Sequence, residues 1–593
     1  MKRFVKFTAL LLSLLILSTQ FYGLNADTSA AAITPFSDVP SSSGYYKAVN
    51  DLRSLGVTGG IGDNKFGAGK ALTRGEFVTW LVRLAGWELE APEKGSYSDN
   101  LDKTKFYFKP VETALKHGLI QKADNFRPEA GMTRLELAAM LVRYLGYDDL
   151  AAKLVSLGKP YEDVTGNAGH IGIIKDLGLM DAYAGADGVH FKPAESVLRE
   201  QAALSLMGAY EKLQTPITFL NAFYAISSNS QRDKINSLSS ACFGWSRLTY
   251  DVKTGQVLFN MAHDGTTHDE YYLPDGFSER VSMAKDAGIP AMLSVFATQD
   301  VKVPGTAAGT SVGMVEYVLT TPGEDDKLIA AIADHLKLTS NTAESSSFDG
   351  VVIDFEGLRG NILKEAFNAF LKKLETQLTA DGKKLYIAVP PLIAPARSSA
   401  SIDGYDYKTI GSLADKVILM AHDYNAKTLT DSDMARGVSD TPLTPVEDVY
   451  YALKAITDKT TGVQDRSKIM LQISFGWYGW QEKDGKTLNR RPDNYSYDGF
   501  MNIINGPSST VNWSQNSRNP YLKFTDAATG IENTIWYEDS RSVQEKMNLA
   551  EFFGITDISL WRLGLIADRE PVPGSKAVYM DVWQTILSEM GKN

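Results

Sequence analysis

Cysteine and histidine are almost absent from this sequence, and basic charge is in deficit. Its 593 residues include one cysteine, Cys242, and seven histidines. A single cysteine excludes an intrachain disulfide, and without CxxC or HExxH motifs we expect no metal site. The sequence indicates no organic cofactor either. The 60 Lys and Arg residues stand against 71 Asp and Glu residues, a net charge of −11. This acidic balance argues against nucleic acid as a partner, because nucleic acid binds basic stripes.

Long apolar runs are also missing, except at the N-terminus. Three basic residues precede an apolar run over residues 7–17, and a small-residue sequence, Ala30-Ala31-Ala32, follows. This pattern predicts a secretory signal peptide over residues 1–32, with an uncleaved anchor as the alternative. No later segment reaches the roughly 18 apolar residues of a membrane span, so we expect no membrane association after signal cleavage. A large exported chain without disulfides favours a bacterial cell envelope.

One pattern occurs three times between residues 36 and 212. Each copy opens on an aromatic residue followed closely by Asp, continues through a helical stretch that ends at Gly, and closes on a second helix. In the first two copies that helix begins Thr-Arg-x-Glu, a capping box formed by Thr73 with Glu76 and by Thr133 with Glu136. Each copy is too small to bury its own apolar face, so the three should pack together. The predicted copies span residues 36–90, 97–150 and 161–212.

This repeated pattern resembles the S-layer homology domain. The resemblance implies an α-helical assembly with pseudo-threefold symmetry that binds secondary polysaccharides of the bacterial cell wall. It also implies that Arg74, Arg134 and Arg199 contact anionic glycan, since a guanidinium offers a carboxylate two parallel hydrogen bonds. The alternative is that these arginines cap helices or pair with neighbouring acids. The third copy departs most from the family pattern, with Leu198-Arg199-Glu200-Gln201 at the start of its second helix.

From residue 216 to 592, short β-rich runs alternate with helical stretches. This alternation is typical of βα units, and eight such runs fit a (β/α)8 barrel. A polar, aromatic segment over about residues 480–540 separates the last two runs and is expected to form a small α+β insertion. The predicted strands are Phe219–Ile226, Ala241–Leu248, Ala291–Phe296, Gly350–Phe355, Leu385–Val389, Lys416–Met420, Ile469–Phe475 and Asp557–Trp561.

The fourth run ends in two carboxylates. Strand alternation places Val352, Asp354 and Glu356 on one face, which in a barrel points inward. The two acids are about 6.6 Å apart along the strand. They lie at its C-terminal end, where barrel enzymes build their active sites. Carboxylates this close push their pKa values apart, so that one can act as an acid.

The same segment resembles the DGxDxDxE signature of family 18 glycoside hydrolases, the chitinase family. Asp349, Gly350, Asp354 and Glu356 match it, whereas Val352 replaces the middle Asp. Two further stretches resemble the sixth and eighth strands of the family: Met420-Ala421-His422-Asp423-Tyr424, with His in place of Tyr, and Ile558-Ser559-Leu560-Trp561-Arg562-Leu563-Gly564.

The resemblance implies a retaining mechanism in which the substrate's own N-acetyl group attacks the anomeric carbon. Glu356 would protonate the glycosidic oxygen, Asp354 would hold the acetamido N–H, and Asp423 would polarise that group. The alternatives are that His422 is a core histidine bonded to Asp423 and that Trp561 only packs the barrel. The substrate-binding residues implied are Asp349, Met420, His422, Tyr424 and Trp561.

Together these features predict a secreted glycosidase on the bacterial cell wall or S-layer surface. Its substrate would be a β-linked N-acetylglucosamine polymer. Peptidoglycan is favoured over chitin because an anchor keeps the enzyme among the chains of its own wall. The first alternative is a barrel that binds such glycans without cleaving them, which the Val352 and His422 departures motivate. The second is a purely structural surface-layer subunit.

Overall fold

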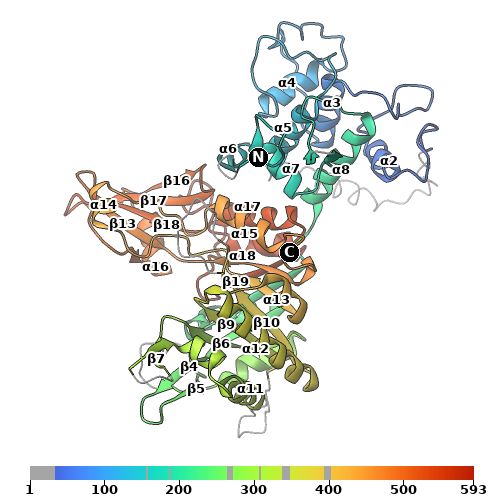
Figure 1. Cartoon of the computed structure of the whole chain (residues 1–593). Coiled ribbons are helices and arrows are strands. Elements are labelled where there is room, and N and C mark those ends of the chain that lie inside the picture. Colours follow the sequence, from blue (N-terminus) through green and yellow to red (C-terminus); the bar gives the residue numbers. More distant parts are fainter. Residues whose placement is uncertain are drawn as a thin grey trace, which may run out of the picture. The chain divides into compact units, whose positions relative to one another are not determined.

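The chain forms two compact units that divide between Gln214 and Thr215 (Figure 1). The structure is a computed structural model, and it describes residues 34–154, 158–185, 188–263, 271–305, 309–336, 348–392 and 403–592. The predicted signal peptide lies outside the described residues. Within those residues, no helix has both the length and the apolar character needed to cross a membrane.

The first unit is mainly helical and repeats the order predicted from the sequence. Thr73 and Thr133 form complete capping boxes with Glu76 and Glu136, and these boxes fix where two of the longer helices begin. The elements are α2 (Tyr46–Ser54), α3 (Arg74–Leu84), α4 (Phe108–Lys116), α5 (Arg134–Tyr144), α6 (Asp148–Leu154), α7 (Ala168–Asp176), β1 (Tyr183–Gly185), β2 (Gly188–His190) and α8 (Arg199–Gln214).

A closed ring of main-chain hydrogen bonds joins three segments far apart in the sequence. The N–H of Met132 donates to the Leu72 carbonyl at 2.8 Å, that of Val197 to the Met132 carbonyl at 2.8 Å, and that of Leu72 to the Val197 carbonyl at 2.9 Å. All three side chains are fully buried. Because α3, α5 and α8 each begin two residues after a ring member, the ring holds the starts of these three helices together.

The second unit is built on a closed barrel of eight parallel strands, as predicted. The strands follow the order β3-β19-β12-β11-β10-β9-β6-β4, and β4 pairs with β3 to close the barrel. They are β3 (Phe219–Tyr224), β4 (Ser240–Asp251), β6 (Ala291–Thr298), β9 (Gly350–Glu356), β10 (Lys384–Val389), β11 (Lys416–Leu419), β12 (Ile469–Ser474) and β19 (Asp557–Trp561).

Helices and short hairpins surround this barrel. A 3₁₀ segment, η2, follows β3, and β5 extends β4 as an antiparallel hairpin. The surrounding elements are η2 (Ile226–Ser237), β5 (Gln256–Asn260), α9 (Phe277–Asp286), β7 (Lys302–Pro304), β8 (Ser311–Gly313), α10 (Met314–Thr320), α11 (Glu324–His335), α12 (Gly360–Ala380), α13 (Tyr407–Leu413), α14 (Asp431–Ala435), α15 (Val446–Ile456), η3 (Arg466–Lys468), α17 (Ser540–Phe552) and α18 (Val582–Glu589).

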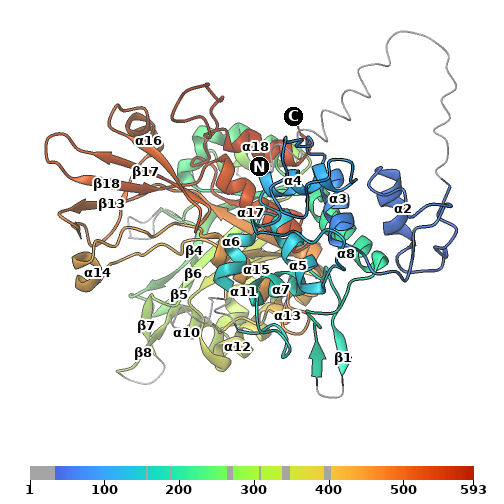
Figure 2. The same ribbon diagram turned by 90° about the horizontal axis from the view of Figure 1, so that it is seen from above.

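A separate antiparallel sheet is inserted between β12 and α17. Figures 1 and 2 show its strands extending away from the barrel helices. In register, Tyr478 pairs with Trp536, which pairs with Tyr521, so an aromatic row crosses the sheet. Its elements are β13 (Tyr478–Lys483), β14 (Lys486–Thr487), β15 (Asp493–Asn494), α16 (Tyr497–Ile504), β16 (Thr510–Ser514), β17 (Asn519–Thr525) and β18 (Glu532–Trp536).

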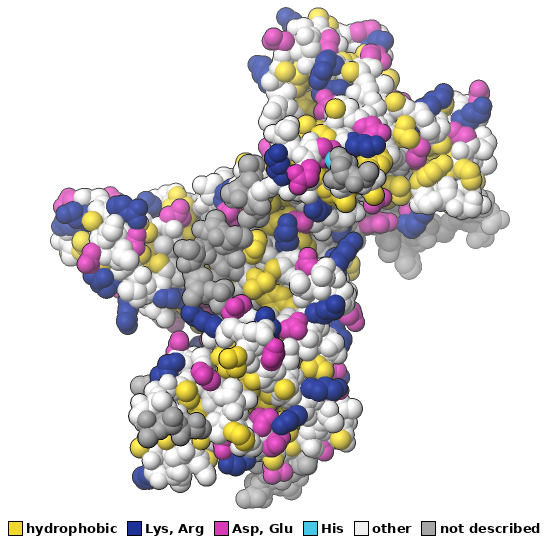
Figure 3. Space-filling view, in the orientation of Figure 1, with side chains coloured by type: hydrophobic (Ala, Val, Ile, Leu, Met, Phe, Trp, Pro, Cys, Tyr) yellow, Lys and Arg dark blue, Asp and Glu magenta, His cyan; other side chains and the backbone are white. Residues whose placement is uncertain are grey.

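The surface carries charge of both signs. On the face shown in Figure 3, basic and acidic side chains are interspersed over the described residues. On this face, charges of neither sign form a continuous stripe.

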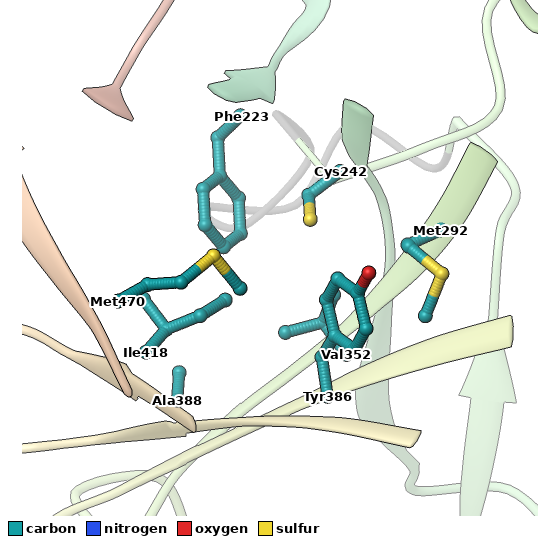
Figure 4. Packing of buried hydrophobic residues seen from close by; sticks show 8 residues of the cluster. All are labelled: Phe223, Cys242, Met292, Val352, Tyr386, Ala388, Ile418 and Met470. Carbon is teal, nitrogen blue, oxygen red and sulfur yellow. The ribbon is translucent and has the colours of Figure 1, made fainter. Parts of the chain in front are cut away.

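An apolar cluster fills the barrel interior (Figure 4). Eight buried residues from seven of the eight barrel strands form it, and Met420 and Trp561 pack against it. Val352 points into this cluster, whereas Phe355 packs outside on Phe370 of α12 with ring centroids 5.6 Å apart. The predicted alternation along β9 is therefore observed. The cluster is Phe223, Cys242, Met292, Val352, Tyr386, Ala388, Ile418 and Met470.

Candidate active site

Two carboxylates on β9 lie above the apolar cluster. Asp354 is 6% exposed, and its Oδ1 atom has no hydrogen-bond partner among the described residues. Burial raises the pKa of Asp354 well above its usual range, and the charge of Glu356 adds to this. Burial also raises the pKa of Glu356. The strand end is fixed by Tyr405, whose hydroxyl donates to the Phe355 carbonyl at 2.6 Å.

The floor beneath these acids is mainly apolar. Val352, which replaces the family's middle Asp, is fully buried next to Tyr386 and Met292 (Figure 4). It offers Asp354 no polar atom with which to share a proton. An unpaired buried carboxyl group favours its protonated form, and this accounts for the direction of the Asp354 pKa shift.

His422 and Asp423 follow β11 at the same end of the barrel. The His422 Nδ1 atom lies 3.2 Å from Asp423 Oδ2, and Lys427 Nζ lies 3.5 Å from Asp423 Oδ1. Burial acts to raise the pKa of Asp423, but His422 and Lys427 outweigh it and lower that pKa to about 2. Asp423 also has a φ of 60°. Such a left-handed conformation is costly outside glycine and is often found at functional sites.

A chain of buried polar groups holds His422 from behind. Its Nε2 atom lies 2.6 Å from Gln472 Oε1, and Gln472 Nε2 donates to Ser559 Oγ at 3.3 Å. Asn221 Nδ2 also donates to Ser559 Oγ, at 2.9 Å, and its Oδ1 accepts from the Cys242 thiol at 3.1 Å. This series of hydrogen bonds links β11, β12, β19, β3 and β4 across the barrel. It fixes the orientation of the His422 ring.

Three other predicted site residues lie around this group. Trp561 ends β19 and meets Phe223 edge-on, with ring centroids 5.1 Å apart. Met420 directly follows β11 and packs on the apolar cluster. The Tyr424 hydroxyl donates to the carbonyl of Asp448, on α15, at 3.4 Å. The sequence neighbours His422 and Asp423 both influence the pKa of Glu356, whereas the Tyr424 hydroxyl is directed to a helix.

The structure does not bring Asp349 to this group, which corrects one expectation. Asp349 precedes β9, so it lies at the opposite end of the strand from Glu356. Its carboxylate accepts from the Ala291 N–H at 2.9 Å and pairs with Lys285. Gly350 is also explained there, because a Cβ at this position would lie 2.2 Å from the Lys384 carbonyl oxygen. This half of the motif joins neighbouring strands at the bottom of the barrel.

Four residues near the site were not predicted from the sequence: Asp300, Gln472, Tyr478 and Arg562. Asp300 and Asp423 both act to raise the pKa of Glu356. Tyr478 begins the inserted sheet, and Asp423 and Arg562 both influence its pKa, which burial raises. Only Arg562 could have been found by inspection, because it directly follows Trp561 in the eighth-strand motif.

The predicted wall-binding arginines form equivalent contacts between copies in the first unit. Their Nε atoms donate to main-chain carbonyls: Arg74 to Phe126 at 2.8 Å, Arg134 to Phe191 at 2.7 Å, and Arg199 to Phe66 at 2.8 Å. Arg134 is 3% exposed and Arg199 is 2% exposed. Each arginine therefore binds the turn of another copy, and direct glycan binding by these side chains stays a prediction.

The acids that face these arginines differ between copies. Arg74 pairs with Glu136, and Arg199 pairs with Glu76 at 2.5 Å. Gln201 stands at the corresponding place in the third copy, where its side chain accepts from the Leu198 N–H at 3.0 Å. For Arg74 and Arg199, in the first and third copies, the structure shows pairing with an acid of another copy.

No group of three or more His, Cys, Asp or Glu side chains arranged to hold a metal ion occurs within the described ranges.

Two family models match the chain. Residues 314–565 match the glycosyl hydrolases family 18, and residues 35–78 and 97–138 match the S-layer homology domain. No such match covers the third copy, which stays a prediction. The first match includes β9, β11 and β19, the strands that carry or precede the acidic site.

Relatives are found for each unit. The cortical fragment-lytic enzyme of Bacillus subtilis (strain 168) is 27% identical over 226 residues, which are 38% of this chain and 48% of that protein. The chain thus spans about half the length of this relative. A cell surface protein of Thermoanaerobacter kivui is 31% identical over 156 residues, 25% of this chain and 18% of that protein.

Among solved structures, the spore cortex-lytic enzyme SleL of Bacillus cereus is 20% identical with a TM-score of 0.44, covering 63% of this chain and 75% of that one. The family match and the relatives agree with the barrel and with the repeated helical pattern. The chain therefore carries one glycoside hydrolase domain of family 18 together with S-layer homology domains.

Proposed function

We propose that the chain is a cell-wall-anchored glycosidase that hydrolyses β-linked N-acetylglucosamine polymers, with peptidoglycan favoured over chitin. The observation that carries this proposal is the pair Asp354 and Glu356 at the C-terminal end of β9, both with raised pKa values. A raised pKa favours the protonated form of Glu356, which a general acid requires.

The proposed mechanism is substrate-assisted retention. Glu356 gives its proton to the glycosidic oxygen as the substrate's acetamido oxygen attacks the anomeric carbon. Asp354 accepts the acetamido N–H through Oδ1, the buried oxygen that has no partner in the described structure. Glu356, now ionised, then takes a proton from the water that opens the cyclic intermediate, and the original anomeric configuration returns.

His422 and Asp423 are proposed to bind the acetamido group on its other side. Asp423 is held as a carboxylate by its low pKa, and the Gln472 contact fixes the His422 ring. Trp561, on the barrel floor, is proposed to lie under the sugar at the cleavage point. Met420 would complete this floor. Tyr424 would act indirectly, through the hydrogen bond from its hydroxyl to the Asp448 carbonyl.

The helical unit is proposed to bind a secondary wall polysaccharide and so to place the protein, after secretion, on the bacterial cell wall or S-layer surface. Tethering keeps a hydrolase at a high effective concentration of its substrate. The relatives, a cortical fragment-lytic enzyme and a cell surface protein, support the pairing of a lytic barrel with a surface anchor.

The proposal is tested with the full chain and its Glu356→Gln variant, on purified peptidoglycan and on chitin oligomers. New reducing ends are identified by mass spectrometry. We expect fragments with reducing N-acetylglucosamine from the unaltered protein and a loss of about 10³-fold or more in Glu356→Gln, because the general acid is removed. Glu570→Gln, at an exposed acid, is the control and should keep full activity.

A binding protein without catalysis is the second candidate, and the apolar surroundings of Val352 favour it. Asp354 there lacks the inner carboxylate that other members of the family have. If the unaltered protein binds both polymers but releases no product from either, the barrel is a glycan-binding module and the catalytic proposal fails.

A further inference from the structure

A partly buried arginine lies at the mouth of the barrel without an acidic partner. Arg562 directly follows Trp561, the last residue of β19. Its Nη1 atom has two neutral acceptors at long range, the Ser228 hydroxyl at 3.5 Å and the Leu563 carbonyl at 3.4 Å. Within the described ranges, no carboxylate lies within ion-pair distance of it.

Three other arginines of the same unit are paired with acids. Arg541 contacts Asp539 at 2.6 Å, Arg280 contacts Glu279 at 2.7 Å, and Arg518 contacts Glu545 at 3.3 Å. Removing a guanidinium from water without a counter-charge is unfavourable. Burial accordingly lowers the pKa of Arg562, and the neighbouring phenols of Tyr271 and Tyr478 only partly offset this.

The surroundings of Arg562 connect it to the acidic site. Tyr478 is near both, because Asp423 and Arg562 both influence its pKa. Lys427, which lies 3.5 Å from Asp423, also stands over the Tyr478 ring at 5.8 Å. On the other side, Tyr271 stacks on Phe296 of β6 with centroids 4.5 Å apart. The guanidinium is therefore at the strand ends, beside the place where a sugar next to the cleaved bond would lie.

We propose that Arg562 binds a carboxylate of the substrate, so that the barrel prefers an acidic N-acetylated glycan to a neutral one. This inference rests on the proposed function and adds a substrate class to it. A chitin chain offers only hydroxyl and neutral acetamide groups. A peptidoglycan strand offers carboxylates, either on the lactyl ether of its muramic acid residues or on the peptide attached there. A guanidinium recognises either one with two parallel hydrogen bonds.

The test removes the charge from each partner in turn. Peptide-free and peptide-bearing peptidoglycan strands are each prepared in native form and with carboxylates converted to amides. Values of kcat/KM are measured for the full chain and for Arg562→Gln, Arg562→Lys and the control Arg569→Gln, an exposed arginine. Thermal melting checks that each variant is folded.

We expect the unaltered protein to prefer native over amidated strands by about tenfold or more, in line with a hydrogen bond between charged groups. Arg562→Gln should bring this ratio to about one, Arg562→Lys should keep part of it, and Arg569→Gln should keep all of it. The strand type that shows the preference identifies the lactyl or the peptide carboxylate.

Failure of this inference differs from failure of the proposed function. If the protein cleaves neutral and acidic strands equally, or if Arg562→Gln keeps the preference, the Arg562 inference is wrong and the hydrolase stands. If nothing is cleaved, the hydrolase is wrong, and sedimentation binding of the same native and amidated strands decides the inference by the same ratios.

Discussion

The single residue Asp354 shows how an active-site group can lower the folding stability of the protein. Its carboxyl is buried without a charge partner, and its pKa is raised by burial and by Glu356. Below the unfolded pKa of about 3.9 both states bind the proton, and the folded form has its full stability. As the pH rises toward the folded pKa, the unfolded chain loses that proton first, and stability falls.

We therefore predict that Asp354→Asn raises the melting temperature at pH 8 by a few degrees and by less at pH 4.5. The amide keeps the shape and removes the buried charge. It should also lower hydrolytic activity, because a neutral amide cannot balance the positive charge of the cyclic intermediate as a carboxylate can. Melting curves of both proteins at the two pH values check the first part. An equal shift at both pH values would show that the buried charge is not the cause.

Among the secondary-structure elements, the barrel strands could be predicted from the sequence, but the side-chain contacts between them could not. Alternation, length and flanking turns identify strands such as β9 and β12, because these signals are local. The contact between His422 and Gln472 joins β11 to β12, and no local signal reports it. The family motif also suggested one site for Asp349 and Glu356, although the length of β9 separates them.

The same limit applies to the helical unit. Repetition predicted its copies and its capping boxes, both of which depend on residues a few positions apart. That Arg199 would reach back to Phe66 and Glu76 depends on how the copies close on each other. The spacing of residues within one copy holds no information on that closure, so the sequence alone left two roles open for each arginine.

We predict that Arg199→Ala destabilises the helical unit by about 3 kcal/mol, because it leaves the half-buried Glu76 carboxylate without its partner. Thermal unfolding of the full chain, followed by circular dichroism, measures the change in the helical transition. Adding Glu76→Gln should recover part of the loss. Lys122→Ala, at an exposed lysine, is the control and should change little. A loss below about 1 kcal/mol for Arg199→Ala would contradict the prediction.

At the scale of the whole molecule, anchoring and hydrolysis are proposed to belong to different units. A chain without residues 34–214 should hydrolyse soluble oligomers with unchanged kcat/KM but should no longer sediment with purified cell walls. Its rate on intact walls should fall by about tenfold or more, because the effective concentration of substrate is lost. Equal rates on walls for both forms would show that the helical unit does not act as an anchor.

The ring through Leu72, Met132 and Val197 has a consequence for how this chain can change over generations. Each member gives one hydrogen bond and receives one, so a deletion that removes a single member leaves one donor and one acceptor buried and unmatched. Loss of a single helical segment should therefore be costlier than loss of all three together. Closure of the ring through Leu72, Met132 and Val197 thus sets the number of copies.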